Sequence, residues 1–256
     1  MSRAAVNSEV RRYWEAQPCG TGQAVTQDAR AHTPEWYERI EEHRYRLEPY
    51  IHAIAQFSRY HGKRVLEIGV GAGTDHVQWA RAGAECFGVD LTDAAIAITR
   101  EHLELHGLDS TLQRLDAETL PFGDAGFDAV YSWGVIHHSE HPEAIVAEAR
   151  RVLRPGGVFI GMVYARHSVV ALKVWLKNAL LRGRPWRTFT DVLRHHMESV
   201  GTKAYTPAEV EALLSGFGHV ELLRRITPYD TKRFPALLSQ CFPAAWGWNL
   251  CFRAYR

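Results

Sequence analysis

Glycines and carboxylates at the ends of predicted strands are the residues of this chain best placed for chemistry. Residues 67–73 read Glu-Ile-Gly-Val-Gly-Ala-Gly and stand between an apolar, strand-like run and a helical one. Gly69, Gly71 and Gly73 permit a tight turn there and let a ligand approach the backbone at the start of a helix. Their spacing differs from the G-x-G-x-x-G of dinucleotide sites, and the Gly-Lys-Ser/Thr of a P-loop is missing. Glu67 would repel a pyrophosphate but would suit a ligand that carries an ammonium group.

Further carboxylates follow the next two predicted strands. Asp90 ends the second strand, where it can accept hydrogen bonds from both hydroxyls of a ribose, and Leu91 comes directly after it. Asp116, Ala117 and Glu118 follow the third strand, where a carboxylate can bind the amino group of adenine or, alternatively, cap a turn. An adenosine that carries an amino acid fits all these positions. The sequence therefore predicts binding of S-adenosylmethionine, with S-adenosylhomocysteine as its product.

The elements that must position these residues alternate along the middle of the chain. Short apolar runs alternate with helical spacings of about ten to fifteen residues, a pattern typical of a parallel, doubly wound α/β sheet. We expect five strands in this region, at 64–69, 85–90, 111–115, 127–133 and 158–164. We expect helices at 74–82, 93–106 and 142–153, the last of them closed by a Pro-Gly-Gly turn.

Helical and strand-like patterns also occur outside this alternating region. The first thirty residues are expected to form an arm, and helical spacing covers 36–60, 168–181 and 190–200. A capping-box pattern, with Thr206 as the cap and Glu209 three residues on, begins another helix. The last two strands, 219–226 and 246–255, are expected to pair antiparallel at an edge of the sheet, with a Pro-containing loop between them.

Five motifs in order resemble the class I S-adenosylmethionine-dependent methyltransferases, within them the type 11 domain group, which includes enzymes similar to ubiquinone, menaquinone and small-molecule methyltransferases. In chain order they are Glu67–Gly73, Asp90, Asp116–Phe122, Trp133–His138 and Leu153–Gly157. The resemblance implies a Rossmann-like sheet of seven strands with the last one antiparallel, and S-adenosylmethionine as the cofactor. Trp133, which ends the fourth strand, is predicted to contact that cofactor.

The resemblance also suggests how the chain is divided. It is strong over residues 61–164, the expected cofactor-binding core, and extends in outline over 206–256, the expected C-terminal helix and strand pair. An N-terminal arm with helices (1–60) and a helical substrate-lid insertion (165–205) lie outside the shared core. In this class such segments differ between enzymes that act on different substrates. We therefore expect both segments to contribute to the acceptor site.

His137 and His138 are the candidate catalytic residues. Methyl transfer is an in-line displacement, and a base is needed when the acceptor carries a proton of high pKa. An imidazole that titrates near neutrality could take that proton from a hydroxyl. Alternatively, the pair only positions its loop or packs against the cofactor. Because adjacent residues cannot easily converge on one ion, the histidines and glutamate of 137–141 do not predict a metal site.

Two regions are candidates for the acceptor wall. Residues 165–205 hold eight basic and two acidic residues, a local net charge of +6 in a chain whose total is +1. The predicted acceptor contacts are Tyr13, Trp14, Lys173, Lys177, Lys203 and Tyr205. Three interpretations stay open: the bases bind an anionic small molecule, an amphipathic helix lies on a membrane and takes a lipid-like acceptor, or the basic face is simply solvated.

Composition excludes several classes of function. Lys and Arg total 30 against 29 Asp and Glu, so the chain has no global nucleic-acid footprint, and neither DNA nor RNA is a favoured partner. No apolar run approaches the roughly 18 residues of a membrane span, and the N-terminus lacks the apolar segment of a secretory signal. Four cysteines without C-x-x-C spacing indicate reduced thiols, so we expect a cytoplasmic location.

The sequence thus predicts an enzyme, a methyltransferase that uses S-adenosylmethionine to modify a small biosynthetic molecule, with an anionic acceptor as the first candidate. O-methylation is favoured, because 132–135 lack the Asn/Asp-Pro-Pro-Tyr of enzymes that methylate DNA adenine or glutamine. An RNA- or protein-modifying methyltransferase that docks through the basic insertion is the alternative. A non-catalytic sensor of S-adenosylmethionine is a third hypothesis.

Overall fold

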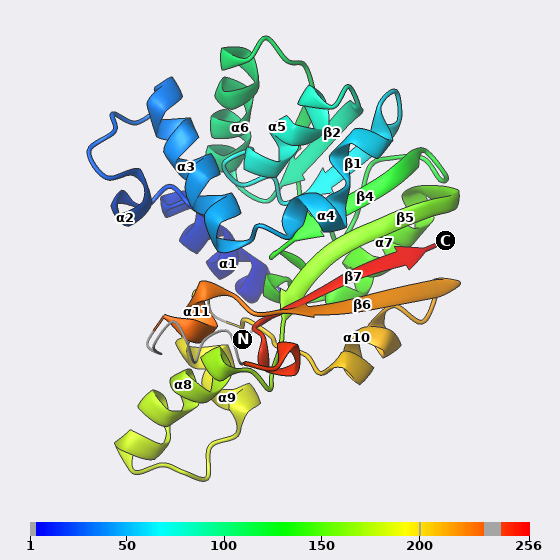
Figure 1. Cartoon of the computed structure of the whole chain (residues 1–256). Coiled ribbons are helices and arrows are strands. Elements are labelled where there is room, and N and C mark those ends of the chain that lie inside the picture. Colours follow the sequence, from blue (N-terminus) through cyan, green and yellow to red (C-terminus); the bar gives the residue numbers. More distant parts are fainter. Residues whose placement is uncertain (1–3, 200, 233–241) are drawn as a thin grey trace.

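A seven-stranded sheet organises the computed structural model, which describes residues 4–199, 201–232 and 242–256 (Figure 1). The strands are β1 (Arg64–Ile68), β2 (Glu85–Asp90), β3 (Thr111–Arg114), β4 (Phe127–Trp133), β5 (Leu153–Tyr164), β6 (His219–Arg225) and β7 (Asn249–Tyr255). Their order across the sheet is β3-β2-β1-β4-β5-β7-β6. The first five run parallel, and β7 pairs antiparallel with both β5 and β6. The predicted Rossmann-like sheet with an antiparallel last strand is therefore confirmed, with β6 rather than β7 at the edge.

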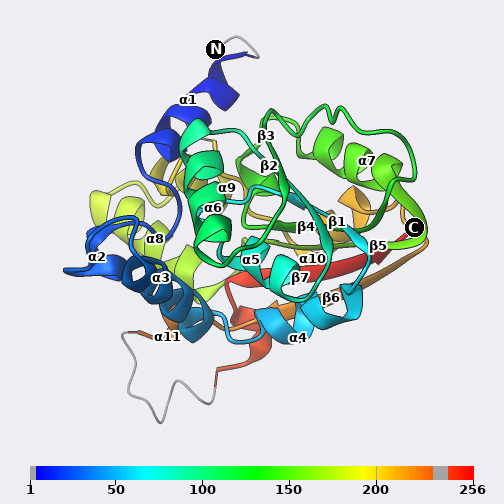
Figure 2. The same cartoon turned by 90° about the horizontal axis from the view of Figure 1, so that it is seen from above.

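Helices cover both faces of the sheet and its carboxyl edge (Figures 1 and 2). Those before and within the core are α1 (Ala4–Ala16), α2 (Gln23–Thr26), α3 (Pro34–Leu47), α4 (Ile51–Ala55), η1 (Phe57–Tyr60), α5 (Thr74–Arg81), α6 (Asp93–Leu105), η2 (Ile136–His138) and α7 (Pro142–Val152). Those after the core are α8 (Val169–Asn178), η3 (Leu180–Arg182), α9 (Phe189–His196), α10 (Pro207–Leu213), α11 (Pro228–Thr231) and η4 (Ala244–Trp246). None of the helices in the described ranges is long and apolar enough to cross a membrane.

Alternating side chains on the central strands explain the two layers of the core. Val65 on β1 packs on one face with α4, η1 and α5, whose Trp79 is fully buried. Leu66 and Ile68 point to the opposite face, where they pack with α7 and α10. Because successive side chains of a strand point to opposite sides, a strand with buried side chains on both sides requires cover on both faces.

The strand order reverses between β1 and β4, and this reversal sets where a ligand can bind. β2 and β3 lie on one side of β1, while β4 and β5 lie on the other. The loops that leave β1 and β4 therefore diverge, and a crevice opens at the carboxyl ends of the strands. The glycine-rich loop, Asp90 and the histidine pair all follow strands at this edge.

The structure differs from the sequence-based expectations in three places. β5 begins at Leu153 and not at residue 158, because the predicted Pro-Gly-Gly turn forms a bulge within the strand, where the pairing jumps from Phe127–Leu153 to Ala129–Val158. Helical spacing was expected over 36–60, where the structure has three separate elements, α3, α4 and η1. α11 was not predicted, and the rest of the Pro-containing loop falls largely outside the described residues.

Candidate functional site

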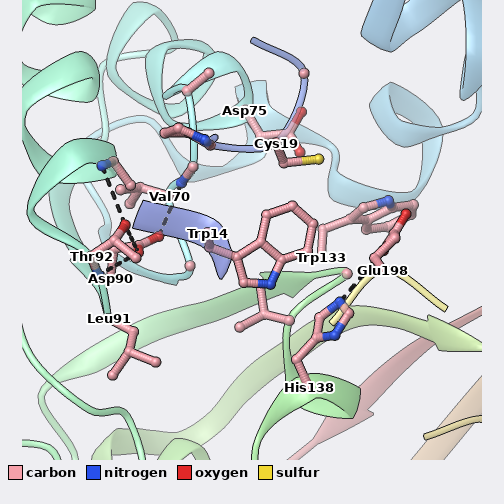
Figure 3. A pocket seen from close by; sticks show the side chains of 18 of the residues that line it. Trp14, Cys19, Val70, Asp75, Asp90, Leu91, Thr92, Trp133, His138 and Glu198 are labelled. Atoms are coloured by element: carbon pink, nitrogen blue, oxygen red, sulfur yellow. Dashed lines mark hydrogen bonds and ion pairs between the residues drawn. The ribbon is translucent and has the colours of Figure 1, made fainter. Parts of the chain in front are cut away.

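A cavity of about 750 Å³ lies at the carboxyl ends of β1, β2 and β4 (Figure 3). Its volume is within the usual range for small-molecule sites. The loops after these strands form its floor, and α1 and the segment after it form one wall. The residues around α8, α9 and α11 close its far end. The following predicted site residues line it: Tyr13, Trp14, Glu67, Gly69, Gly71, Asp90, Leu91, Asp116, Ala117, Trp133 and His138.

Positive φ angles and close packing shape the glycine loop. Gly69 has φ +83°, and a Cβ there would lie 2.2 Å from a methyl of Val135. Gly71 has φ +56°, but a Cβ on it would meet nothing within 4 Å. The first glycine is therefore needed for packing and backbone conformation, whereas the second leaves open space beside the backbone. Gly73 caps α5 and does not line the cavity.

Asp90 ties the second strand to the glycine loop. Its carboxylate accepts hydrogen bonds from the Gly71 N–H (3.2 Å) and from both the N–H (2.9 Å) and the hydroxyl (2.7 Å) of Thr92. Burial raises its pKa, although these hydrogen bonds act in the opposite direction. A carboxylate offers about four acceptor positions, so these three donors leave capacity for a ligand hydroxyl.

Glu67 is a buried acid with a histidine partner. Its Oε2 lies 3.0 Å from Nδ1 of His76, whose Nε2 lies 2.8 Å from the Ser110 hydroxyl. The Ser110 hydroxyl donates its proton to the Cys86 carbonyl, so it can only accept from Nε2–H. Burial lowers the pKa of His76 to about 4 and raises that of Glu67 well above its usual value. The ring is therefore neutral with Nδ1 as an acceptor, and Glu67 carries the proton.

Asn7 of α1 joins the loop after β3 to the N-terminal arm. Its side-chain amide donates to Asp116 (2.9 Å) and to Glu118 (2.8 Å). Glu118 also accepts from the Ser139 hydroxyl at 2.6 Å and the His141 N–H at 3.0 Å. Glu118 does not line the cavity. Its contacts connect three separate segments, while Asp116 and Ala117 face the ligand space.

The two histidines of η2 have different environments. His137 is fully buried and does not line the cavity, and its ring lies 3.9 Å from the ring of Tyr164. His138 lines the cavity, and its Nδ1 lies 2.8 Å from the Ser199 hydroxyl and 3.1 Å from that of Thr202. Because the Thr202 hydroxyl already donates to the Ser199 carbonyl, it can only accept a hydrogen bond from Nδ1–H. This arrangement favours a neutral ring whose Nε2 carries the lone pair.

Nε2 of His138 has no hydrogen-bond partner among the described residues and lies 3.8 Å from Oε2 of Glu198. Burial and the nearby Lys203 lower the pKa of His138 to about 3. Glu198 accepts a hydrogen bond from the Tyr164 hydroxyl at 3.0 Å, and burial raises its pKa. The indole ring of Trp14 lies 5.4 Å from the His138 ring (Figure 3). These side chains enclose one corner of the cavity.

A buried polar cluster that the sequence did not point to lies beside Trp133. The Trp133 indole N–H donates to Glu48 at 2.8 Å. Arg44 bridges Glu48 (3.2 Å) and Asp75 (2.6 Å), and Asp75 also accepts from the Tyr131 hydroxyl. Arg44, Glu48 and Asp75 all line the cavity. A helix was predicted over 36–60, but its pattern does not tell which polar side chains turn inward.

The structure does not bring four predicted acceptor contacts to the cavity. Lys173 donates to the backbone carbonyls of α11, at Tyr229 (3.1 Å) and Asp230 (2.6 Å), and Lys177 is exposed. Lys203 donates to the Ser139 carbonyl at 2.5 Å. The Tyr205 hydroxyl is buried with no hydrogen-bond partner in the described part of the chain. No group of three or more potential metal ligands occurs among the described residues.

Residues 66–161 match the family model described as a methyltransferase domain. The ubiquinone biosynthesis O-methyltransferase of Cereibacter sphaeroides is 28% identical over 76% of this chain and 70% of its own. The namesake from Nitrosococcus oceani is 34% identical over 38% of this chain, which spans only 41% of that relative. The magnesium protoporphyrin IX methyltransferase of Synechocystis PCC 6803, solved with S-adenosylhomocysteine, has a similar fold, with a TM-score of 0.62 and 15% sequence identity. The match covers 98% of this chain and 99% of that structure.

Residues 66–161 form a methyltransferase domain, and the chain is similar to the class I S-adenosylmethionine-dependent methyltransferases. Its cofactor is S-adenosylmethionine, in agreement with the prediction from the glycine loop and the acidic strand ends. The matched region covers β1 to β5 and leaves out α1, the α8–α9 hairpin and α11. These unmatched elements supply the far end of the cavity.

Proposed function

We propose that this methyltransferase transfers a methyl group to a hydroxyl oxygen of a small biosynthetic molecule. The observation that carries the proposal is the His138 side chain, whose Nε2 lone pair has no hydrogen-bond partner in the described structure at one corner of the cavity. The names of the ubiquinone O-methyltransferase relatives support a hydroxyl as the acceptor group. Among the described residues that line the cavity, Arg44 is the single Arg or Lys, and this supports a small molecule over a nucleic acid.

The cavity residues fit the cofactor part by part. Asp90 would bind a ribose hydroxyl with its remaining acceptor position, and Asp116 would bind the adenine amino group. Glu67 would bind the ammonium group, and the cation would draw the proton from its carboxyl by lowering the pKa. The open space beside Gly71 admits a ligand against the backbone. When bound, S-adenosylmethionine supplies an electrophilic methyl group on a sulfonium.

His138 would act as the general base. Its Nε2 takes the proton of the acceptor hydroxyl while that oxygen forms its bond to the methyl carbon and the carbon–sulfur bond breaks. In this structure Nε2 is covered, so the hydroxyl must enter between His138 and Glu198, which are 3.8 Å apart. Catalytic hydrogen bonds commonly tighten only when substrate is bound. The ionised form of Glu198 would stabilise the imidazolium.

The far end of the cavity favours an uncharged acceptor. Its wall there carries the rings of Trp14, Tyr164 and Trp248 together with Met197 and the acidic Glu198. An anion would be repelled by Glu198 and would gain nothing from the lysines, which point elsewhere. We therefore propose a neutral, largely apolar acceptor that carries one reactive hydroxyl.

Transfer of a labelled methyl group tests this function. Purified protein is incubated with S-adenosylmethionine that carries a labelled methyl group, and with the small-molecule, RNA or protein fraction of a cell extract. We expect the label in the small-molecule fraction, on an oxygen. Label in RNA or protein would contradict the proposal and support the alternative function, and no transfer to any fraction would support a sensor.

Calorimetry with Asp90→Ala tests the cofactor site separately. We expect the wild type to bind S-adenosylhomocysteine and to ignore NAD. Loss of one hydrogen bond to a charged acceptor should weaken binding by about 1.5–3 kcal/mol. Asp109→Ala, at an acidic residue in the loop before β3 that does not line the cavity, is the matched control. Unchanged affinity in Asp90→Ala would exclude the assigned role of this carboxylate.

A further inference from the structure

The tip of the α8–α9 hairpin combines exposed apolar side chains with unpaired positive charges. Leu180, Leu181 and Trp186 are 45%, 80% and 75% exposed, and they lie in the ten residues that connect the two helices. Lys177, Arg182 and Arg184 are exposed around them. We call these six residues the hairpin tip. Figure 1 shows the hairpin extending away from the sheet, and none of the six tip residues lines the cavity.

The apolar residues of the tip are left over after the hairpin has formed its own core. Ala171 on α8 and Leu193 on α9 are buried together with Trp248, and Val174 and Phe189 pack against them. Trp175 stacks on Phe189 and donates its indole N–H to the Arg187 carbonyl at 2.6 Å. The hairpin is thus stable without Leu181 and Trp186. Exposing such large apolar side chains brings no stability to the monomer, and contiguous exposed apolar surface commonly marks an interaction site.

The charges of the tip lack partners. No acidic residue occurs between Arg166 and Thr190, a stretch with six Arg and Lys. Arg187 pairs with Asp191 at 2.5 Å, whereas Lys177, Arg182 and Arg184 have no ion-pair partner within the described ranges. Each of these three exposed bases can therefore meet a negative charge outside the protein.

We propose that the hairpin tip docks on an anionic membrane surface. Exposed Trp and Leu can enter the boundary between headgroups and acyl chains, while nearby Arg and Lys bind anionic headgroups. Each basic residue near such a surface adds to the attraction. The sequence suggested an amphipathic helix as a membrane contact, but the inner face of α8 is occupied, and the tip takes that role. RNA is less suitable, because the aliphatic Leu180 and Leu181 offer no stacking surface for bases.

Docking at the tip would also orient the cavity. α8 is ten residues long, so its first turn lies about 15 Å from the tip. Val170 in that turn and Tyr229 of α11 both line the cavity, and Tyr229 is 53% exposed. Docking would therefore place the part of the cavity lined by Val170 and Tyr229 toward the membrane. The docking proposal concerns where the protein binds and holds whether or not the proposed methyl transfer is correct.

Vesicle co-sedimentation tests the proposal without knowledge of the acceptor. Wild-type protein is mixed with vesicles of phosphatidylcholine, or of phosphatidylcholine and phosphatidylglycerol in equal parts. We expect pelleting with the anionic vesicles only, and release by added salt because exposed charges are screened. Leu181→Ala combined with Trp186→Ala should lower the bound fraction at least tenfold. Leu105→Ala, at a residue 44% exposed on α6 at the other end of the molecule, should bind like the wild type.

Charge-reversal variants provide a second test of vesicle binding. Arg182→Glu combined with Arg184→Glu should abolish binding to anionic vesicles, whereas Lys63→Glu combined with Arg100→Glu, with the same change in net charge, should not. Circular dichroism verifies that the variants fold. Wild-type protein that stays in the supernatant with anionic vesicles at low salt would overturn the proposal. An equal loss of vesicle binding in both charge-reversed variants would also overturn it. So would binding of transfer RNA through these basic residues, seen as a gel shift, without vesicle binding.

Discussion

Adjacent residues in one motif can have opposite environments, and His137 and His138 illustrate this. His137 packs its ring on Tyr164 and is wholly buried, with neither ring nitrogen hydrogen-bonded in the described structure. His138 lines the cavity and has its Nδ1 fixed by two hydroxyls. A ring held through one nitrogen presents the other in a defined direction. Only His138 therefore has the geometry of a base, although the sequence offered both.

His138→Ala should lower kcat by about 100-fold or more, the usual contribution of a general base. The low pKa of His138, about 3, keeps its Nε2 unprotonated at every pH above roughly 4. Protonation of this residue should therefore cause no fall in the wild-type rate as the pH decreases through neutrality. The loss in the variant should shrink at high pH, where the acceptor ionises without help. Rates measured from pH 6 to 10 with the identified acceptor check this.

The affinity for S-adenosylhomocysteine should be nearly unchanged in His138→Ala, which separates a chemical role from a structural one. His137→Asn is the comparison, because it removes the neighbouring ring without touching the cavity. If His138→Ala keeps the wild-type kcat at all pH values, the base role is excluded while the methyltransferase assignment stands.

The predictable part of the site consists of residues next to strand ends. Gly69, Gly71 and Asp90 follow β1 and β2 in sequence, and the parallel sheet brings them to one edge. Arg44 and Glu198 reach the same cavity from a helix before the sheet and a segment after α9. No local motif marks them, because their place depends on how distant elements pack.

Among the elements, α1 shows how the N-terminal arm is held over the cofactor side of the cavity. Asn7 forms the hydrogen bonds to Asp116 and Glu118, and its carbonyl oxygen accepts from the Glu140 N–H at 2.9 Å. Arg11 adds an ion pair with Asp93 at 2.8 Å on α6. Figure 2 shows α1 lying beside α6. These contacts hold α1 against the cavity, so loosening them should make it easier for a bound ligand to leave.

Asn7→Ala should therefore speed dissociation of S-adenosylhomocysteine, by about tenfold if one to two kcal/mol of closure free energy is lost. Unfolding by urea should change little, because the arm contributes few core residues. Stopped-flow displacement measures the dissociation rate. Arg12→Ala on the same helix, at an exposed residue, is the control and should behave as the wild type. Equal dissociation rates in both variants would show that α1 does not retain the ligand.

Strands were easier to predict than the orientation of helices. β2 and β4 begin and end at the predicted residues, since short, largely apolar or aromatic runs bounded by turns define them. α8 was also predicted, but its lysines were assigned to the acceptor, whereas Lys173 binds the backbone of α11. Periodicity identifies the faces of a helix, but the neighbour that covers each face depends on tertiary packing. The same limit applies to α11, which has only four residues.

At the scale of the whole molecule, charge is separated between the sheet core and the hairpin. Residues 61–164 carry eight basic and fifteen acidic residues, while 165–205 carry the excess of bases. The acidic groups near the cavity suit a cofactor with a net positive charge. Most of the basic residues of 165–205 lie in the α8–α9 hairpin, which extends away from the sheet (Figure 1). The two regions therefore serve different contacts, and the near-zero net charge of the chain conceals both.

Buried neutral histidines also make the stability of the whole molecule depend on pH. Burial lowers the pKa of His76 and of His102 to about 4. In the unfolded chain a histidine has a pKa near 6.5. The unfolded state therefore binds more protons between these values, and stability present above pH 6.5 is lost as the pH falls toward 4. Glu67 and Glu198, whose pKa values are raised, act in the opposite direction.

His102 allows this effect to be measured apart from the active site. It lies on α6, with Nδ1 3.2 Å from the Ala72 carbonyl and its ring stacked on Tyr37 at 4.3 Å. His102→Gln keeps a donor for that carbonyl and removes the titrating group. Between pH 6 and 4.5 the free energy of unfolding should fall less steeply than in the wild type, by roughly 1.4 kcal/mol per pH unit. Urea titrations across this range measure the slope. The exposed His219→Gln, whose side chain is 68% exposed, should leave the slope unchanged. Parallel curves for His102→Gln and the wild type would mean that His102 does not resist protonation in the folded protein.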